Sequence, residues 1–304
     1  MKLLSIAARR LLLASSFILS TSFLPSALVL ADSGVYKTQI GDLEIIALSD
    51  GHNQLSASFF SNTDATSSTE SYKTAVNVYL VKLGEQLILI DSGNGDRASG
   101  ESSLMAQALE AAGYREDEVD IVLLTHFHGD HINGLLKDDE RRFTQAKVYA
   151  AKEEVAYWLS EEKMMQAPER ARASFAQVQK VLAPYQDSGQ FEEFEAGQII
   201  MDGVKSVFAP GHTPGHSGFF FDTGAEQGFL MWGDIVHNLP LQFADPEITI
   251  VFDSDKPQAI KTRREMFELV ADEPVVVAGT HIDFPGMGQV TKKSDGSYAW
   301  QARD

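Results

Sequence analysis

Short runs rich in apolar, β-branched and aromatic residues recur in the first part of the chain, and such runs are typical of strands. Two such runs, 35–40 and 43–48, flank a Gly-Asp turn and predict a hairpin. The runs 76–82 and 86–90 predict a second pair of strands. A continuous apolar run at 120–125 predicts a strand that is buried in the core.

Helical periodicity and turn residues organise the rest of the chain. Amphipathic patterns predict four helices, at 102–112, 151–158, 169–182 and 256–270. Short apolar runs predict further strands, at 204–208, 219–222, 228–232 and 274–278. The stretch 53–71 is rich in Ser and Thr and predicts a long surface loop, of the kind that often lines a functional site.

The order of these elements predicts a single α/β domain. Two strand-rich parts of the chain each carry helices, and they can bury their apolar faces as two sheets packed face to face with the helices outside. The sequence contains no linker rich in Pro and Gly that would separate two domains. A hydrophobic content of 44% and a charged content of 22% are ordinary for a globular protein with a packed core.

The first 31 residues have the composition of a secretory signal peptide. Lys2, Arg9 and Arg10 precede a long apolar stretch, and small residues lead to a cleavage site after Ala31. A retained membrane anchor is the alternative, but a proline and several serines interrupt the apolar stretch and disfavour a spanning helix. Cleavage would leave 273 residues (304 − 31), a single domain at 32–304, in the periplasm or outside the cell.

The charge and the cysteine content restrict the partners. The formal net charge is −18, and removal of three basic residues with the signal peptide gives −21 (−18 − 3). A protein this acidic repels nucleic acid and anionic membrane surfaces, so we expect neither as a partner of the mature protein. The chain has no cysteine, which excludes disulfide bonds, thiolate metal ligands and a cysteine nucleophile. A small neutral substrate fits these properties best.

The densest group of potential metal ligands follows the predicted buried strand directly, in the run THFHGDH at 125–131. His126 and His128 are two positions apart at a strand end, so they point the same way and can bind one ion. Gly129 permits a sharp turn, after which Asp130 and His131 can face a second ion. Imidazole and carboxylate are ligands that zinc and similar metals prefer. A solvated His-rich loop is the alternative, and the spacing favours the metal site.

Three further potential ligands lie downstream, each in a loop after a predicted strand. His212 lies in PGHTPGHSG at 210–218, Asp234 follows a Trp-Gly pair, and His281 follows the last predicted strand. Rigid elements commonly present functional groups at such positions. Each residue alone would more often be an ordinary loop residue. Together they supply the ligands that a pair of ions would still lack.

Three of the eight histidines lie outside this set. His216 is four residues after His212 and could orient a ligand. His52 fits an ordinary loop histidine. His237 lies near Asp234 and could face a substrate.

Four polar residues beside the predicted ligands have two readings each. Asp50 and Asp91 precede glycine-containing turns and fit turn residues better than residues that orient a ligand. Thr125 and Thr213 each adjoin a predicted ligand. Orientation of that ligand and simple turn formation are equally compatible with their positions.

The full set resembles the metallo-β-lactamase superfamily, whose members carry HxHxDH followed by a distant His, Asp and His. Every position of that pattern is matched, by His126, His128, Asp130, His131, His212, Asp234 and His281. The resemblance covers nearly the whole mature chain and implies an αββα sandwich of two mixed sheets. It also implies one ion held by His126, His128 and His212. A second ion would be held by Asp130, His131 and His281, with Asp234 as the bridge.

The resemblance implies two divalent metal ions as cofactors, with zinc as the expected metal. Two adjacent ions lower the pKa of a shared water, which yields a nucleophile near neutral pH. One ion also polarises a carbonyl or phosphoryl oxygen of the substrate. Asp234 would fix the spacing and take up a proton, so Asp234 and Asp130 are the expected catalytic carboxylates.

Several segments are similar to the methyl parathion hydrolase subgroup of that superfamily. They are AAGY at 111–114, WGDIVH at 232–237, QFADP at 242–246, FDSD at 252–255 and FPGMG at 284–288. The similarity implies an exported hydrolase of lactones and phosphotriesters, often a homodimer, with a pocket walled by aromatic residues. Trp158 and Phe175 fall where two of these aromatic residues should be. Each is equally compatible with a core aromatic on a helix.

The favoured hypothesis is hydrolysis of a small neutral ester, above all an acyl-homoserine or aryl lactone, with phosphotriester hydrolysis as a further activity. β-Lactam hydrolysis is less favoured, because the true β-lactamases lack the bridging aspartate. A glyoxalase-II-like thioesterase shares the ligands, but the 81 positions from His131 to His212 (212 − 131) are too many for it. Nucleases of the superfamily need basic grooves, which the charge disfavours.

A non-hydrolytic protein of the same fold is the alternative from another class. A redox protein of the flavodiiron type has Glu where this chain has His128. A non-catalytic metal-binding protein would be expected to have lost ligands, and none is missing here.

Overall fold

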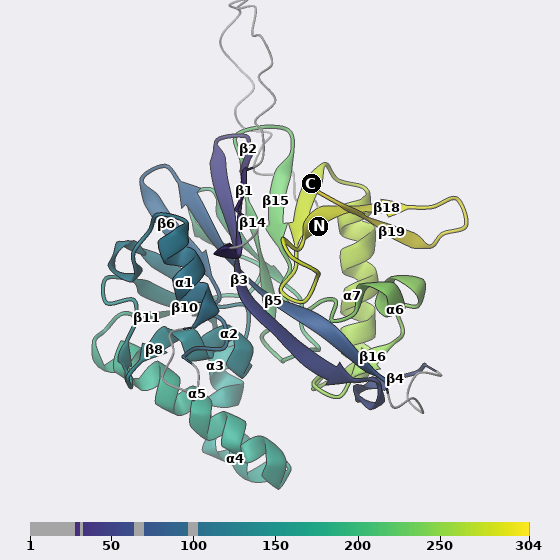
Figure 1. Cartoon of the computed structure of the whole chain (residues 1–304). Coiled ribbons are helices and arrows are strands. Elements are labelled where there is room, and N and C mark those ends of the chain that lie inside the picture. Colours follow the sequence, from purple (N-terminus) through teal and green to yellow (C-terminus); the bar gives the residue numbers. More distant parts are fainter. Residues whose placement is uncertain (1–27, 31–32, 64–69, 97–102, 304) are drawn as a thin grey trace, which may run out of the picture.

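The strands form two large mixed sheets that pack face to face, with helices on both outer sides (Figure 1). The computed structural model describes residues 28–30, 33–63, 70–96 and 103–303. The predicted signal peptide, 1–31, lies outside these residues except for one short strand. The αββα sandwich expected from the sequence is confirmed.

The first sheet has eight strands in the order β1-β2-β3-β5-β6-β7-β10-β11. From β1 through β6, each strand is antiparallel to the next strand in this order. From β6 through β11, each strand is parallel to the next. The strands are β1 (Leu28–Leu30), β2 (Val35–Ile40), β3 (Leu43–Ser56), β5 (Ser71–Leu83), β6 (Gln86–Ile90), β7 (Ile121–Leu123), β10 (Lys147–Ala151) and β11 (Phe191–Phe194).

The second sheet has seven strands in the order β12-β13-β14-β15-β17-β18-β19, of which only β15 and β17 are parallel neighbours. They are β12 (Ile199–Met201), β13 (Val204–Phe208), β14 (Ser217–Phe221), β15 (Gly228–Met231), β17 (Val275–Ala278), β18 (Met287–Lys292) and β19 (Tyr298–Ala302). Two small pairs join β4 (Phe60–Ser61) with β16 (Thr249–Ile250), and β8 (Leu136–Lys137) with β9 (Glu140–Arg141).

Helices α1 and α5 cover the outer face of the first sheet, and α7 covers that of the second (Figure 1). The α-helices are α1 (Leu104–Ala111), α2 (Gly129–Ile132), α3 (Lys152–Trp158), α4 (Glu161–Gln166), α5 (Glu169–Asp187), α6 (Leu239–Ala244) and α7 (Lys256–Ala271). Side-chain caps at Ser103 and Asp255 begin α1 and α7. Within the described ranges, no helix is both long and apolar enough to cross a bilayer.

Alternating side chains along the strands divide the core into three layers. In β14, Phe219 and Phe221 pack between the two sheets, whereas Phe220 packs in the outer layer that includes α7. In β5, Tyr79 lies between the sheets and Val78 packs toward the opposite layer. Successive side chains of a strand point to opposite faces, so both faces of each central strand are apolar. This arrangement explains why β14 contains three consecutive phenylalanines, at 219–221.

The stretch 53–71, expected as one long loop, is partly strand. β3 continues to Ser56 and β5 begins at Ser71, and the two strands stay paired over this length. Pairing of the backbone satisfies its polar groups whatever the side chains are, so a polar sequence can still form a hairpin. His52 is therefore an exposed strand residue and not the expected loop histidine. Residues 64–69 lie outside the described residues.

Besides β1 and the strands of the two small pairs, five strands carry no clear sequence signal, namely β10, β11, β12, β18 and β19. Three of them, β11, β12 and β19, lie at sheet edges. An edge strand has a neighbour on one side only and is partly exposed, so polar and charged residues are tolerated in it. The sequence FEEF of β11 is an example.

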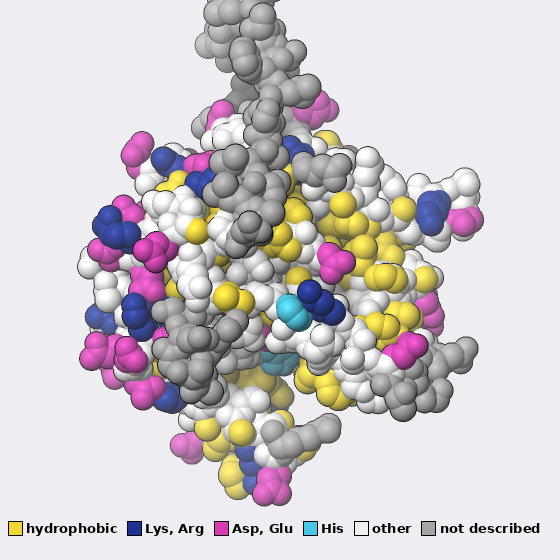
Figure 2. All heavy atoms as spheres, viewed as in Figure 1, with side chains coloured by type: hydrophobic (Ala, Val, Ile, Leu, Met, Phe, Trp, Pro, Cys, Tyr) yellow, Lys and Arg dark blue, Asp and Glu magenta, His cyan; other side chains and the backbone are white. Residues whose placement is uncertain are grey.

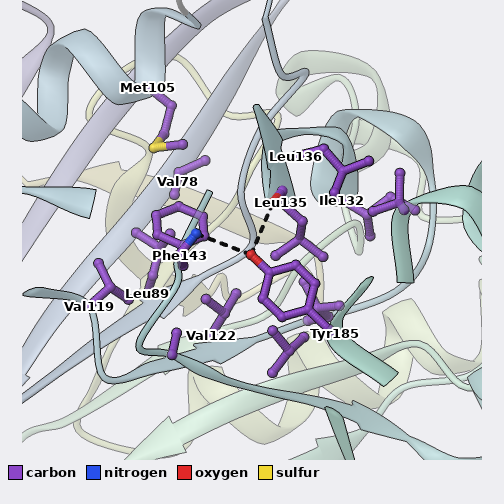
Figure 3. Packing of buried hydrophobic residues seen from close by; sticks show 14 of the residues in the cluster. Val78, Leu89, Met105, Val119, Val122, Ile132, Leu135, Leu136, Phe143 and Tyr185 are labelled. Carbon is purple, nitrogen blue, oxygen red and sulfur yellow. Dashed lines mark hydrogen bonds between the residues drawn. The ribbon is translucent and has the colours of Figure 1, made fainter. Parts of the chain in front are cut away.

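The core beneath α5 contains a tyrosine hydroxyl that pairs with two backbone groups (Figure 3). Tyr185 is buried, and its hydroxyl accepts from the amide of Phe143 at 3.1 Å and donates to the carbonyl of Leu135 at 2.9 Å. We expect Tyr185→Phe to leave both groups unpaired and to lower the free energy of unfolding by about 1–3 kcal/mol in urea denaturation. Tyr114→Phe is the control, because that hydroxyl lies at a partly exposed site. Equal losses in both variants would contradict the expectation.

Candidate metal centre

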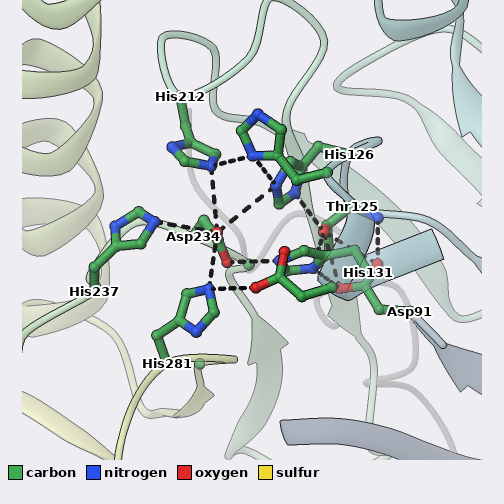
Figure 4. A network of polar contacts seen from close by, with 12 residues as sticks. Asp91, Thr125, His126, His131, His212, Asp234, His237 and His281 are labelled. Carbon is green, nitrogen blue, oxygen red and sulfur yellow. Dashed lines mark hydrogen bonds and ion pairs between the residues drawn. The ribbon is translucent and has the colours of Figure 1, made fainter. Parts of the chain in front are cut away.

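The predicted ligands lie just beyond the ends of four central strands (Figure 4). β7 leads into the run 125–131, β13 leads to His212, β15 to Asp234 and β17 to His281. Because β15 and β17 are parallel neighbours, the residues that follow them emerge at the same edge of the second sheet. The structure thus brings all seven predicted ligands together from stretches that are far apart in the sequence.

The first ligand group consists of His126, His128, His212 and Asp234, whose ligand atoms lie within 4.8 Å of one another. Nδ1 of His128 is 3.0 Å from Nε2 of His126 and 2.9 Å from Nε2 of His212. Oδ2 of Asp234 is 3.3 Å from Nε2 of His212 and 3.7 Å from Nε2 of His126. Ligand atoms bonded to one tetrahedral zinc ion lie about 3.3 Å apart, so this spacing fits a single ion.

The second ligand group consists of Asp130, His131 and His281. Nε2 of His131 is 3.8 Å from Oδ1 of Asp130 and 3.3 Å from Oδ1 of Asp234. Nε2 of His281 is 3.6 Å from Oδ2 of Asp130 and 3.1 Å from Oδ2 of Asp234. Asp234 therefore contacts both groups, which is the position expected of a bridging ligand (Figure 4).

The chemistry of these atoms fits two metal ions. Nε2 of His131 and Oδ1 of Asp234 are buried and make no hydrogen bond within the described residues. A buried polar atom without a hydrogen bond is costly, and a cation would satisfy both. In the first group, Nδ1 of His128 lies within 3.0 Å of an imidazole nitrogen of His126 and of one of His212. Neutral imidazoles cannot all donate to one another, whereas their lone pairs can converge on one ion.

A single turn of helix separates the two groups. α2 begins at Gly129, and His128 is its N-cap residue. The chain turns at Gly129 as expected, and its backbone there is helical, so the turn does not depend on a positive φ. A Cβ at Gly129 would lie 2.9 Å from Nδ2 of Asn133, so the Asn133 side chain would have to shift to admit one. The helix turns Asp130 and His131 away from the direction of the preceding strand.

Asp91 orients His131 and is more than the turn residue expected from the sequence. Its carboxylate is buried, and Oδ2 lies 2.9 Å from Nδ1 of His131. It also accepts from the amide and the hydroxyl of Thr125, at 2.8 and 2.9 Å. The Thr125 hydroxyl in turn lies 3.0 Å from Nδ1 of His126. Such contacts fix which ring nitrogen of a ligand histidine faces a metal ion.

The two downstream histidine ligands are oriented in the same way. Nδ1 of His281 donates to the carbonyl of Ala75 at 2.8 Å. Nδ1 of His212 lies 2.9 Å from Oδ1 of Asp253, and Oδ2 of Asp253 accepts from the amide of Ile250 at 3.0 Å. Burial alone would raise the pKa of Asp253, but the hydrogen bond and charge of His212 outweigh it and lower the pKa to about 2. The sequence interpretation did not identify Asp253, which lies in an exposed-looking FDSD run.

We expect Asp253→Asn to weaken zinc binding at the first ligand group by about 10–100-fold, the range typical of residues that orient a ligand histidine. Asparagine keeps the shape but loses the negative charge beside His212. It also cannot accept from both His212 and the amide of Ile250. Competition with a chromophoric chelator measures the affinity. Asp202→Asn, in the exposed turn between β12 and β13, is the matched control and should bind zinc as the wild type does.

His216 contacts the main chain of Asp234, the expected bridging residue. Its Nε2 accepts from the amide of Asp234 at 2.9 Å, and its Nδ1 donates to the carbonyl of Ala209 at 2.9 Å. Burial lowers the pKa of His216 to about 3, so the ring is neutral. Gly233 has a φ of 62°, and a Cβ there would lie 2.4 Å from Nε2 of His216. Glycine is therefore required for Asp234 to reach this position.

Aromatic side chains flank His128. The ring of Trp158 is 5.7 Å from that of His128, and the ring of Phe252 is 6.4 Å away. Phe252 is 44% exposed and packs edge-on against Phe59. Phe175 is 1% exposed and packs against Trp158 with ring centroids 4.7 Å apart. It therefore lies in the core and supports Trp158 from behind.

His237 lies inside the centre. Its Nε2 is 3.2 Å from Oδ2 of Asp234, and its ring stacks on that of His281 at 5.0 Å. Burial lowers the pKa of His237 to about 4, so the ring is neutral. His237, Asp234 and His281 also form a third group whose ligand atoms lie within 4.8 Å of one another.

Glu154 is the other residue that the sequence interpretation missed. It lies on α3, is 1% exposed, and accepts from backbone or side-chain groups of both ligand-bearing loops. One signal was present in the sequence. Trp158 is four positions later on the same helix, so both side chains share a face, and a residue at 154 points toward the interior with Trp158.

The fold and the ligand set define the class of protein. The model of the metallo-beta-lactamase superfamily matches residues 72–281 and so includes all seven predicted ligands. The chain belongs to this superfamily and is a metal-dependent hydrolase. The resemblance inferred from the sequence is confirmed.

Individual relatives include hydrolases and lactonases. The crystal structure of the hydrolase AbOPH in the beta lactamase superfamily is 32% identical, covers 89% of this chain and 99% of that chain, and has a TM-score of 0.81. AidC, a dizinc quorum-quenching lactonase, is 24% identical over 89% of this chain and 98% of its own, with a TM-score of 0.79. The N-acyl homoserine lactonase of Bacillus thuringiensis is 22% identical over 67% of this chain and 80% of that protein.

Proposed function

We propose that this protein opens lactones, with one zinc ion at each ligand group. The observation that carries the proposal is the position of Asp234, whose carboxylate oxygens lie 3.1 to 3.7 Å from ligand nitrogens of both groups. Two zinc ions held there would supply a nucleophile from water and polarise the ester carbonyl.

The residues of the chain would fix the geometry and handle protons. Asp234 is 3% exposed and sets the separation of the two groups. The side chain of Asp130 is 23% exposed, so this predicted ligand is more accessible from solvent than the buried ones. His237 contacts Asp234 as a neutral ring and adds no charge to the centre. We assign Asp234 and Asp130 as the catalytic carboxylates.

The surroundings of the centre favour a neutral, partly apolar substrate. The ion pairs that the ligands form within the described residues involve only histidine and aspartate, with no Lys or Arg. An anionic group of a substrate would therefore find no Lys or Arg partner among these contacts, beyond the proposed ions themselves. Trp158 and Phe252 offer apolar contact area beside His128. Acidic side chains are also spread over the face shown in Figure 2, which disfavours polyanions.

Relatives support the same substrate class. AidC is a dizinc lactonase, and the Bacillus thuringiensis relative is an N-acyl homoserine lactonase. The proposal also includes export, which rests on the N-terminal sequence. Fractionation of cells that express the full chain, with N-terminal sequencing of the mature protein, tests export, and we expect the mature chain to begin at Asp32.

A substrate screen with purified, zinc-loaded protein tests the function. The panel contains acyl-homoserine lactones of several chain lengths, an aryl lactone, aryl esters, a phosphotriester, a thioester and a chromogenic β-lactam. We expect the lactones to have the highest kcat/KM, with two zinc ions per chain by elemental analysis. His126→Ala is the control for adventitious hydrolysis. Lactone turnover no higher than that of the control would refute the proposal, and preferential β-lactam or thioester turnover would replace it.

A further inference from the structure

Glu154 makes four hydrogen bonds beside the metal centre, and none of the functions above accounts for it. Its Oε1 accepts from the amide of Phe127 at 3.0 Å and from the indole Nε1 of Trp158 at 2.7 Å. Its Oε2 accepts from the hydroxyl of Thr213 at 2.7 Å and from the amide of Gly215 at 2.9 Å. All four partners are donors, so both oxygens are fully used.

These contacts connect ligands that come from different sheets. Phe127 lies between His126 and His128, which follow a strand of the first sheet. Thr213 directly follows His212, which lies in the loop after β13 of the second sheet. One carboxylate therefore ties the backbone beside two ligands of the first group to the backbone beside the third.

The position is an unusual place for a carboxylate. Glu154 is 1% exposed, and no Lys or Arg in the described part of the chain forms an ion pair with it. Burial of an unpaired charge is costly, and here only hydrogen bonds compensate it. A well-packed apolar residue would satisfy the core at lower cost. Such a residue could not accept the hydrogen bonds of the four donors, which would then be left without a partner.

Close packing of the two loops depends on the same contact. Gly215 has no room for a side chain, since a Cβ would lie 2.2 Å from the backbone nitrogen of Glu154. The start of α3 and the loop that carries His212 are therefore in direct backbone contact. Hydrogen bonds from Oε2 hold the loop in that contact.

We infer that Glu154 is a positioning residue that sets the separation of His128 and His212 and so determines how tightly the first ligand group retains its ion. The same carboxylate fixes the indole of Trp158 against His128. The inference rests on the metal centre and not on the identity of the substrate. Its test therefore measures metal retention, which a failure of the lactone proposal would leave unaffected.

Glu154→Gln is the informative substitution because it keeps the size of the side chain. Glutamine has one acceptor oxygen and one donor group in place of two acceptors. The oxygen can still serve Phe127 and Trp158, which are fixed donors. The amide group then faces Gly215, whose N–H is also a fixed donor, while the Thr213 hydroxyl can rotate to accept. We therefore expect the loop that carries His212 to move away from α3.

Timed dialysis of the zinc-loaded variant against a chelator, followed by elemental analysis, measures retention. We expect Glu154→Gln to lose one of its two ions, with a dissociation constant raised about 10–100-fold, and to keep the other as the wild type does. At saturating zinc its kcat should recover, which a general loss of structure would not allow. Dissociation constants within twofold of the wild type for both ions would overturn the inference.

Two further variants and a control keep the result interpretable. Thr213→Val removes one of the two bonds to Oε2 and should shift retention in the same direction by less, so it provides an answer if Glu154→Gln does not fold. In the double variant with His212→Ala, Glu154→Gln should cause no further loss of zinc, because both changes act on one ion. An additional loss there would contradict the inference. Glu161→Gln, on the exposed face of α4, should behave as the wild type.

Discussion

Replacement of Asp234 by asparagine should lower kcat/KM for lactone hydrolysis by about 10³-fold, at least as much as loss of one donor from an oxyanion hole costs. Asparagine preserves the size and shape of the side chain but removes its negative charge and one acceptor oxygen. Asp234 is the residue that contacts ligand nitrogens of both groups, at 3.1 to 3.7 Å. Without the carboxylate, the centre would lose the negative charge that contacts both ligand groups and would offset the repulsion between two bound cations. We therefore expect one zinc ion per chain in this variant.

Two measurements distinguish a role for Asp234 in bridging from a role in folding. Elemental analysis gives the number of ions, and the thermal midpoint reports on the fold. Asp202→Asn, the same substitution in an exposed turn, should keep two ions and full activity. If Asp234→Asn retains both ions and more than a tenth of the wild-type activity, Asp234 is not the bridge.

The fold was largely predictable because its central strands are buried on both faces. The segments 121–124 and 274–278 are apolar throughout, and they contain β7 and β17. Edge strands such as β11 were not predictable, since their sequences are polar on the exposed side. The sequence did not predict the pairing of β3 with β5 beyond residue 52, for a related reason. That part of the hairpin is held by backbone pairing, which leaves no trace in side-chain hydrophobicity.

The sequence predicted the candidate metal ligands but not the residues that orient them, because the two kinds of residue leave different traces in a sequence. A metal ligand must be His, Asp, Glu or Cys, so four of them within six positions form a pattern that chance rarely produces. Residues that orient ligands act through ordinary hydrogen bonds. Asp91, Asp253 and Glu154 each contact the centre from another element, at a sequence position that a turn or a helix would also explain. Only the three-dimensional contact distinguishes these roles.

Removal of the metal ions should lower the thermal midpoint as well as the activity. A ligand that binds only the folded state stabilises it by about 4 kcal/mol when present at 1,000 times its dissociation constant. For a domain of this size that corresponds to a loss of roughly 8–16 °C on removal. Differential scanning calorimetry of zinc-loaded and chelator-treated protein measures the difference. The physical cause is the return of Nε2 of His131 and Oδ1 of Asp234 to a buried state without a partner.

The difference in midpoint should also depend on pH. In the metal-free protein, burial lowers the pKa of His212, but hydrogen bonds to Asp234 and Asp253 outweigh it and raise the pKa from its ordinary value of 6.5 to about 9. A pKa raised on folding stabilises the metal-free fold fully below pH 6.5, and this contribution is lost as the pH rises through about 9. Zinc needs the neutral imidazole, so its binding strengthens over the same range. The midpoint difference should therefore grow from pH 6.5 to pH 9. His52→Ala, on the exposed part of β3, should leave this trend intact, whereas a flat or falling difference in the wild type would show that His212 holds no proton for zinc to displace.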